Sequence, residues 1–327
     1  MKILVTGGAG YIGSHAVRWL GREGHEVWVY DNLCAGHREA VNDARLIVGE
    51  LMDRPRLVET LSSKGIEAVM HFAAFAAVGE SVADPAKYYQ NNVVASLNLL
   101  EAMRASGVKK IVFSSTTATY GVPERVPITE EEPQKPINPY GFAKLVIEQA
   151  LADYRAAYGL GYAALRYFNA AGASPEGDLG EDHDPETHLI PIVLEVALGQ
   201  RPNLTVFGDD YPTPDGTCIR DYVHVDDLSS AHALALAQLE PGTALKLNLG
   251  TGRGQSVREV IDACRRVTGH AIPSVIGPRR PGDPPELVAD SRQAQRVLAW
   301  RPHYTDIESI VRTAWRWHSS HPRGYDR

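Results

Sequence analysis

Cysteine is scarce in this chain. The 327 residues include three cysteines, Cys34, Cys218 and Cys264, an odd number at widely separated positions. This spacing supports neither a disulfide framework nor a cysteine metal site, and it is typical of proteins from a reducing compartment. We therefore expect a cytoplasmic location.

Long apolar runs and clusters of basic residues are also lacking. The first apolar run, Ile3–Val5, reaches glycines within a few residues, which is unlike a signal peptide. No stretch approaches the ~20 apolar residues that cross a membrane. The formal net charge is −7, with no run of Lys or Arg, which argues against nucleic acids and membranes as partners. A local cationic site for a phosphorylated ligand remains compatible with this charge.

The first half of the chain alternates short apolar segments with amphipathic ones. We expect strands at Ile3–Thr6, Glu26–Asp31, Leu46–Gly49, Ala68–Ala73, Lys110–Ser115 and Tyr162–Phe168. We expect helices at Ile12–Glu23, Pro55–Lys64, Pro85–Ser106 and Pro139–Tyr158. Strands buried on both faces and separated by helices predict an α/β fold with a doubly wound parallel sheet.

After Asn169 the sequence becomes richer in turn residues. Loops are expected at Ala170–His188, Phe207–Asp221 and Pro273–Pro285, helices at Ile190–Gly199, Asp226–Gln238, Val257–Thr268 and Ile307–His318, and a strand at Lys246–Gly250. We expect residues 1–169 to form one domain, to which later segments near 226–260 return. Residues 170–327 would form mainly a smaller α/β substrate-binding lobe, with a frayed tail at His321–Arg327.

A glycine motif joins the first predicted strand to the first predicted helix, with the sequence Gly7-Gly8-Ala9-Gly10-Tyr11-Ile12-Gly13. Glycines at 7, 10 and 13 allow a tight turn, close approach of a pyrophosphate and close helix–strand packing. The phosphates would meet free N–H groups at the helix N-terminus. The motif predicts a Rossmann dinucleotide-binding sheet.

Asp31 ends the second predicted strand, near the position of the carboxylate that binds the adenosine ribose hydroxyls in such sheets. A carboxylate there would repel a 2′-phosphate, so NAD is favoured over NADP. Asp31 is also suited to begin the Asp-Asn turn at 31–32, and the two roles are compatible. Asp53 is suited to be a helix N-cap.

Tyr140 and Lys144 lie four residues apart, on one face of a predicted helix. Asn138 suits the N-cap and Pro139 the first helical position, which places Tyr140 in the first turn. The positive end of the helix dipole and Lys144 would both favour a phenolate. Lowering the pKa of a tyrosine from ~10 to ~7, where it could act as a base, needs roughly 4 kcal/mol.

This Tyr–Lys pair is common by chance, and its neighbours give it meaning. Ser114-Ser115-Thr116 ends a predicted strand, and ligands gather at the carboxyl ends of parallel strands. Thr116 would orient a substrate hydroxyl, Tyr140 would take its proton, and Lys144 would hold the phenolate and the cofactor ribose. A hydride could then leave the same carbon. Taken singly, each hydroxyl of the Ser/Thr run is better explained by strand-end capping.

With these motifs, the chain resembles the extended short-chain dehydrogenase/reductase superfamily, and within it the UDP-glucose 4-epimerase family, over essentially its whole length. Matching segments include His71–Ala74, Val78–Ser81, Tyr88–Asn92, Arg166–Asn169 and Gly177–Asp182. The segments Phe207–Thr213, Asp215–Thr217 and Arg220–Val225 are more specific, and they point to epimerases rather than to dehydrogenases generally.

The resemblance implies reversible 4-epimerisation of UDP-galactose and UDP-glucose on tightly bound NAD. Tyr140 would deprotonate the sugar 4-hydroxyl while the C4 hydride passes to NAD, and the 4-keto sugar would turn about its pyrophosphate and take the hydride back on its other face. The UDP part must then be gripped and the hexose left loose. The resemblance also implies a homodimer, in which the helices Pro85–Ser106 and Pro139–Tyr158 pair with their copies in a four-helix bundle.

Carried over residue by residue, the resemblance implies two sets of contacts. The cofactor site would comprise Gly7, Gly10, Tyr11, Ile12, Gly13, Asp31, Asn32, Glu50, Leu51, Phe72, Ala73, Ala74, Asn92, Ser114, Tyr140, Lys144 and Tyr167. The substrate site would comprise Thr116, Tyr140, Asn169, His188, Leu189, Phe207, Arg220, Arg280, Asp283 and Leu287.

Within the substrate site, each contact has an implied role. The phosphates would be held by Asn169, Arg220 and Arg280, the uracil by Phe207 and Leu189, and the uridine ribose by Asp283. Arginine suits bidentate phosphate contacts. A surface ion pair with the neighbouring Asp221 is the alternative for Arg220.

The chain departs from the family pattern at four positions. Ala76 stands where some members carry a cofactor-contacting lysine, Glu50 replaces an aspartate, and His188 replaces a uridine-contacting asparagine. Leu287 stands where some members carry a tyrosine that crowds the sugar pocket. We hypothesise that this smaller residue admits N-acetylhexosamines as well.

The loop Glu181-Asp-His-Asp184 with His188 brings acids and histidines near one another in sequence. Such loops are more often solvated turns, and this spacing matches no recognised metal motif. We therefore predict no metal site.

Three alternatives stay open to different degrees. A nucleotide-sugar 4,6-dehydratase is disfavoured, because its relatives place Asp-Glu after the catalytic Thr, where this chain has Thr117 and Ala118. An epimerase of UDP-pentoses stays open. So does a non-catalytic NAD-binding sensor or scaffold, since fold alone never excludes one; the complete Thr116, Tyr140 and Lys144 set argues against it.

Overall fold

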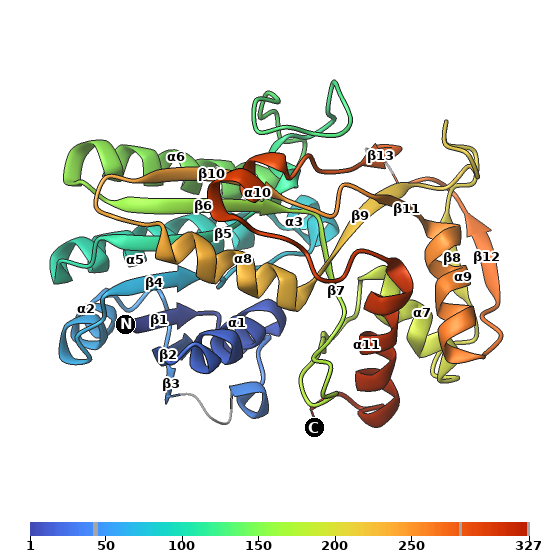
Figure 1. The fold of residues 1–327 in the computed structure, drawn as a ribbon, viewed down its shortest axis with the longest axis horizontal. Coiled ribbons are helices and arrows are strands. Elements are labelled where there is room, and N and C mark those ends of the chain that lie inside the picture. Colours follow the sequence, from blue (N-terminus) through green and yellow to red (C-terminus); the bar gives the residue numbers. More distant parts are fainter. Residues whose placement is uncertain (42–44, 281–282, 326–327) are drawn as a thin grey trace.

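A seven-stranded parallel sheet organises the protein in a computed structural model that describes residues 1–41, 45–280 and 283–325 (Figure 1). Its strand order is β10-β6-β5-β4-β1-β2-β3. The strands are β1 (Lys2–Thr6), β2 (Glu26–Asp31), β3 (Arg45–Val48), β4 (Ala68–His71), β5 (Lys110–Thr116), β6 (Gly161–Tyr167) and β10 (Ala244–Leu249). The predicted α/β fold with a doubly wound parallel Rossmann sheet is confirmed.

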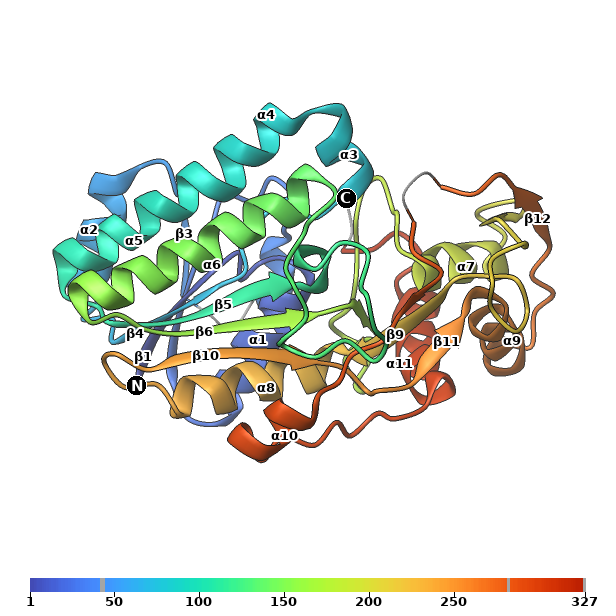
Figure 2. The same cartoon turned by 90° about the horizontal axis from the view of Figure 1, so that it is seen from above.

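Helices cover both faces of this sheet (Figure 2). One face carries α1 (Tyr11–Arg22), α8 (Val225–Ala237) and α10 (Arg292–Leu298), and the other carries α2 (Arg54–Ser63), α5 (Ala95–Ser106) and α6 (Pro139–Tyr158). Each layer buries its own apolar cluster against the strands. Burial of one large aliphatic side chain contributes roughly 1.5–3 kcal/mol, so these two layers supply much of the stability of the fold.

The ends of α6 follow directly from its sequence. The Asn138 side chain accepts a hydrogen bond from the Gly141 N–H at 2.8 Å, and Pro139 occupies the first turn. The helix stops at Gly159, whose φ of 72° suits a residue without a Cβ. These caps fix where Tyr140 begins its turn and confirm the predicted bounds.

The predicted helix Pro85–Ser106 is interrupted, so its prediction as one α-helix is wrong. After α3 (Val78–Ala83) come α4 (Pro85–Tyr88), a π-helical turn η2 (Tyr89–Val94) and α5. The Asn92 side chain, inside this turn, exchanges two hydrogen bonds of 2.9 Å with the Phe75 backbone. Such π turns often lie at functional sites.

Beyond the carboxyl ends of the parallel strands lies a second, four-stranded sheet centred on β9 (Ile219–His224). Its partners are β7 (Asn169–Ala171), β11 (Gly254–Ser256) and β13 (Glu286–Leu287). Residues Ile219–Asp221 were expected in a loop, and that prediction is wrong. All three partners lie far away in sequence, so local composition carries no signal of the pairing.

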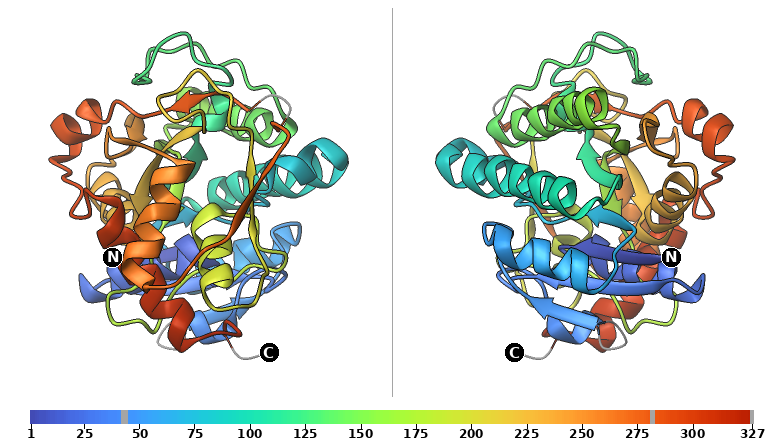
Figure 3. Two further views of the ribbon diagram at one scale, coloured as in Figure 1. Left: turned by 90° about the vertical axis from the view of Figure 1, so that its right-hand side faces the viewer. Right: turned by 90° about the vertical axis from the view of Figure 1, so that its left-hand side faces the viewer.

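The remaining elements form a lobe at one end of the molecule (Figure 3, left). They are α7 (Leu189–Ala197), β8 (Leu204–Phe207), α9 (Val257–Thr268), β12 (Ser274–Gly277) and α11 (Ile307–Ser320), and the helices share a third apolar cluster. Strand β12 lies in the segment expected as a proline-rich loop, and its parallel pairing with β8 corrects that expectation. Short 3₁₀ turns occur at η1 (Arg38–Val41) and η3 (Thr117–Thr119).

The tail is ordered as far as the structure describes it, so the expected fraying is wrong for residues 321–325. The ring of Tyr325 is buried and packs against Trp317 at 4.7 Å between centroids. Its N–H donates to Asp182 at 3.0 Å. Residues 326–327, also expected to fray, lie outside the described residues. Over the described part of the chain, none of the helices is long and apolar enough to cross a membrane.

Candidate active site

The glycine loop lies at the switch point of the sheet, between the carboxyl ends of β1 and β4. Gly7 has a φ of +71°, and a Cβ there would lie 2.4 Å from the Ala73 backbone nitrogen. A Cβ on Gly13 would lie 2.1 Å from the Gly7 carbonyl oxygen. The loop therefore has to be bare backbone at both positions, and bare backbone beside a helix N-terminus is the cradle that a dinucleotide pyrophosphate requires. The residues fit the predicted NAD.

Asp31 ties the end of β2 to this loop. Its buried carboxylate accepts hydrogen bonds from the Ala9 N–H at 2.9 Å and the Leu33 N–H at 2.8 Å. The second bond forms the turn that was expected as the simpler role of Asp31. A carboxylate has about four acceptor positions, so two remain for ligand hydroxyls. At the same edge, Asn32 donates to the exposed carboxylate of Glu50 at 3.1 Å.

Thr116, Tyr140 and Lys144 converge at the carboxyl end of β5. Lys144 Nζ donates to the Ser114 carbonyl at 2.8 Å and lies 5.9 Å from the centroid of the Tyr140 ring. The Thr116 side chain interacts with Tyr140 and favours its ionised form. The hydroxyls of Ser114 and Tyr167 are hydrogen-bonded to each other. Five of the predicted site residues therefore form one contiguous group.

The electrostatics of this group differ from the expectation. Burial raises the pKa of Tyr140, and the interaction with Thr116 only opposes this rise. Burial lowers the pKa of Lys144 to about 7, against the opposing charge of Glu148. The expected stabilisation of a phenolate by Lys144 is absent from the influences on the Tyr140 pKa, among which burial is the largest.

The buried ion pair between Arg166 and Glu148, which lies beneath the site, was not predicted from the sequence. Arg166 on β6 donates to Glu148 on α6 at 2.9 Å through Nε, and both side chains are almost fully buried. Glu148 also accepts from the Ser115 hydroxyl at 2.6 Å. The available signal was the spacing of Tyr140, Lys144 and Glu148, each four residues after the last on one helix face.

The other predicted cofactor residues follow strands β1, β3 and β4 or lie in the turn η2. Asn92 bonds Phe75, three residues after Phe72 at the end of β4. Tyr11 follows the glycine loop, and its hydroxyl donates to the Gly172 carbonyl at 2.6 Å. Ile12 and Leu51 pack against the two apolar clusters of the sheet. Their roles toward NAD stay predictions.

Two pairs of predicted substrate residues meet in the second half. Arg220 on β9 forms an ion pair with Asp283, and the alternative pair with Asp221 is wrong. Asp221 is instead buried and accepts from the Thr251 and Gly252 N–H groups. The Arg280 guanidinium lies 4.2 Å from the centroid of the exposed Phe207 ring.

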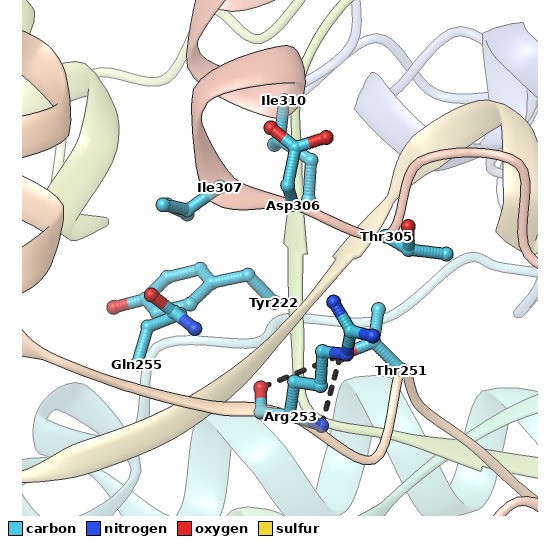
Figure 4. A pocket seen from close by; sticks show the side chains of 8 residues that line it. All are labelled: Tyr222, Thr251, Arg253, Gln255, Thr305, Asp306, Ile307 and Ile310. Carbon is cyan, nitrogen blue, oxygen red and sulfur yellow. Dashed lines mark hydrogen bonds between the residues drawn. The ribbon is translucent and has the colours of Figure 1, made fainter.

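The other predicted substrate residues occupy ends of elements. Leu287 is paired with Arg220 between β13 and β9, and Asn169 begins β7. His188 is the N-cap residue of α7, directly before Leu189, and its ring is hydrogen-bonded to Glu181. A small hollow of about 10 Å³ lies between β9, β11 and the start of α11, lined by Tyr222, Thr251, Arg253, Gln255, Thr305, Asp306, Ile307 and Ile310 (Figure 4). It contains none of the predicted site residues and has room for one water at most.

Comparison with known proteins gives a consistent result. The sequence model of the "NAD dependent epimerase/dehydratase family" matches residues 3–250. A UDP-glucose 4-epimerase of Halalkalibacterium halodurans is 55% identical over 326 residues, 99% of this chain and 98% of that protein.

Two solved structures are similar over nearly the whole chain. UDP-glucose 4-epimerase from Brucella ovis in complex with NAD has a TM-score of 0.94 and 54% identity, covering 96% of this chain and 97% of that one. The UDP-glucose 4-epimerase from Stenotrophomonas maltophila with bound NAD and formylated UDP-arabinopyranose has a TM-score of 0.95 and 42% identity, covering 99% of each chain.

Proposed function

Because the chain belongs to the NAD-dependent epimerase/dehydratase family, we propose that it interconverts UDP-galactose and UDP-glucose by reversible 4-epimerisation with NAD as cofactor. The observation that carries this function is the convergence of Thr116, Tyr140 and Lys144 beside a bare glycine loop, at the carboxyl edge of the parallel sheet. A hydride carrier and a proton acceptor are thereby supplied at one edge, as the oxidation of a sugar hydroxyl requires.

Tyr140 is the proton acceptor in this mechanism. It takes the proton of the sugar 4-hydroxyl, which Thr116 orients, and returns a proton when the alcohol is formed again. When bound, NAD supplies a hydride acceptor and a positively charged ring, and that charge favours the phenolate that burial disfavours. Lys144 Nζ donates a hydrogen bond to the Ser114 carbonyl, and this ammonium is the third polar group of the site beside Thr116 and Tyr140.

Substrate binding follows from the need to present both faces of the 4-keto sugar. We assign the phosphates to Asn169, Arg220 and Arg280, and the uridine to residues of the α7 and β8 ends, with Asp283 at the ribose. The Arg220–Asp283 ion pair supports this assignment because it holds the Arg220 guanidinium near the start of β9. Tight UDP binding and loose hexose binding leave the sugar free to turn.

The two halves would share this work. We propose that residues 1–169, with β10 and α8 returning to them, bind NAD, and that residues 170–327 bind mainly the nucleotide sugar. The pairing of β10 with β6 supports the return of the later segment.

The deciding experiment is conversion of UDP-galactose to UDP-glucose by the purified protein, after its bound NAD has been quantified by absorbance. Stoichiometric NAD with turnover supports the epimerase. Stoichiometric NAD without turnover of any UDP-sugar would instead identify the sensor or scaffold.

The sugar range is a finer proposal. Leu287, a residue smaller than tyrosine, supports conversion of UDP-N-acetylglucosamine, and the pentose nucleotide bound by the Stenotrophomonas relative keeps UDP-pentoses as an alternative. Assays of each UDP-sugar with the wild type and Leu287→Tyr test this. Loss of only the N-acetylhexosamine activity in the variant is expected, and no N-acetylhexosamine conversion by the wild type would refute the proposal.

We also propose a cytoplasmic homodimer. The three cysteines are free thiols, which supports a reducing compartment. The turn η2 and helix α6 expose Tyr89, Val94, Phe142 and Tyr158, apolar side chains suited to a helix bundle with a second copy. Light scattering should give twice the mass of the chain, and Phe142→Asp should shift it towards one chain; a monomeric wild type would contradict the proposal.

A further inference from the structure

Four side chains from the loop between β7 and α7 converge on one point. They are Glu181, His183, Glu186 and His188, and one potential ligand atom of each lies within 4.8 Å of all the others. Over the described part of the chain, this is the one group of three or more His, Cys, Asp or Glu side chains with such convergence. None of the four belongs to the proton-transfer group around Tyr140.

The separations suit a metal ion. His183 Nδ1 lies 3.2 Å from Glu181 Oε1 and 3.7 Å from Glu186 Oε2, and His188 Nδ1 lies 3.7 Å from Glu186 Oε1. His188 Nδ1 and Glu181 are in closer contact. A tetrahedral ion with bonds of about 2.0–2.1 Å separates its ligand atoms by about 3.3 Å, so small side-chain rotations would complete the geometry.

The charges and burial of the group are equally suited to a cation. The carboxylate side chains of Glu181 and Glu186 are 3% and 4% exposed, whereas those of His183 and His188 are 32% and 48% exposed. Both carboxylates are paired with His183 and His188, and a divalent ion would take the place of the imidazole protons and neutralise both. The more exposed imidazoles leave a path by which the ion can enter.

Space adjoins the group. A polar cavity of about 100 Å³ is lined by Glu181, His183 and Glu186, and its other walls come from α7, α11 and the tail, including Glu195, His318 and His321. A cavity of this size holds several waters. It could therefore admit a hydrated ion and solvate a coordinated one.

We propose that Glu181, His183, Glu186 and His188 bind one Zn²⁺ ion that fixes the loop before α7. Imidazole nitrogens favour zinc over calcium or magnesium, and two imidazoles with two carboxylates give the four ligands that a closed zinc site takes. We predicted no metal from the sequence, because the loop Glu181-Asp-His-Asp184 with His188 matches no recognised motif; Glu186 was not among the residues considered. The four ligands all lie within residues 181–188, in the loop that leads to α7.

The ion would position the proposed uridine contacts. His188 is the N-cap residue of α7 and Leu189 its first residue. With Nδ1 on the metal, the neutral His188 ring must carry its proton on Nε2, which makes that atom a hydrogen-bond donor. The zinc site itself stands independently of the proposed activity, because its test measures metal.

The test is metal analysis of the untagged holoprotein after chelation, dialysis and reloading with Zn²⁺. About one zinc per chain should be retained, and Co²⁺ loading should give the visible absorption of a tetrahedral ion. His183→Ala/His188→Ala and, separately, Glu186→Gln should weaken zinc binding on the order of 100-fold or more in a chelator competition. His270→Ala, which removes an exposed histidine elsewhere, should leave it unchanged.

Two results would overturn the proposal. One is a wild type that retains well under one zinc per chain after reloading. The other is equal zinc affinity in the wild type and in Glu186→Gln, which keeps the size of the side chain and so does not depend on the double variant folding. Bound NAD, measured in each preparation, reports whether the variant is folded.

Discussion

At the scale of single residues, the site depends on one phenol held among buried polar groups. Burial raises the pKa of Tyr140, so the neighbouring groups have to hold it in place rather than ionise it in advance. Glu148 and Arg166 stabilise the inner end of the same helix face through a buried bidentate pair. In the proposed mechanism, the Tyr140 hydroxyl is then the only proton acceptor.

Tyr140→Phe should lower kcat by about 10²–10⁴-fold, because it removes the proton acceptor and retains the ring. Bound NAD should be nearly unchanged, and kcat for UDP-galactose with NAD content per chain are the measurements. Tyr158→Phe is the matched control, since that tyrosine is on the same helix and 51% exposed. Activity of Tyr140→Phe within twofold of the control would exclude Tyr140 as the base.

Residue roles were predictable where they depend on neighbours in sequence. Asn138 and Asp53 are N-caps as predicted, because a cap needs only its own helix. The pKa of Tyr140 and the Glu148–Arg166 pair were not predictable, because both depend on burial by distant strands. The loop before α7 was noticed in the sequence, but it was predicted to bind no metal because its spacing matches no recognised motif.

At the scale of elements, the proposed cofactor site depends on the junction of β1 and α1. Gly13 in the first turn of α1 faces the Gly7 carbonyl so closely that no side chain fits. Gly21, in the last turn of the same helix, has open space where a Cβ would lie, with no neighbouring atom within 4 Å. The two glycines therefore have different physical roles.

Gly13→Ala should lose NAD and activity, since its Cβ would lie 2.1 Å from the Gly7 oxygen and force the loop apart. Gly21→Ala should retain both and gain about 0.5–1 kcal/mol in the free energy of unfolding, because alanine favours the helix. NAD content and urea unfolding check both variants. Full NAD content in Gly13→Ala would contradict this prediction, because it would show that the loop can shift enough to accept a Cβ.

Most elements were predictable from apolar periodicity, and the failures involve contacts with residues that are distant in sequence. The bounds of α6 and α9 match the prediction, since their caps are local. The strand β9 and the π turn at Tyr89–Val94 were missed. Strand β9 forms through pairing with strands that are distant in sequence. The π turn occurs where Asn92 forms hydrogen bonds with the Phe75 backbone.

At the scale of the whole molecule, burial makes the fold sensitive to acid. Burial lowers the pKa of His71 and His224 to about 3 and that of His232 to about 4. In the unfolded chain these three histidines become protonated as the pH falls below about 6.5, whereas in the native state they become protonated only at a much lower pH. The stability due to the neutral rings is therefore complete above pH 6.5 and is lost as the pH falls towards 4.

The free energy of unfolding should fall by up to about 4 kcal/mol per pH unit below pH 6.5 from these three histidines together. His232→Leu removes one of these three histidines. Their contribution to the pH dependence of the free energy of unfolding between pH 6.5 and 4.5 should therefore be about one third weaker in the variant. Urea unfolding at several pH values measures it. An unchanged slope in the variant would show that His232 is protonated in the native state.

In the proposed epimerisation, the enzyme oxidises and reduces the same carbon without exchanging the hydride with solvent. UDP-galactose labelled with deuterium at C4 tests this, with the position of the label in the UDP-glucose product read by NMR. We expect deuterium to be retained at C4 through the change of configuration. Deuterium replaced by solvent hydrogen at C4 would contradict it, because the hydride would then not have been held and returned within the site.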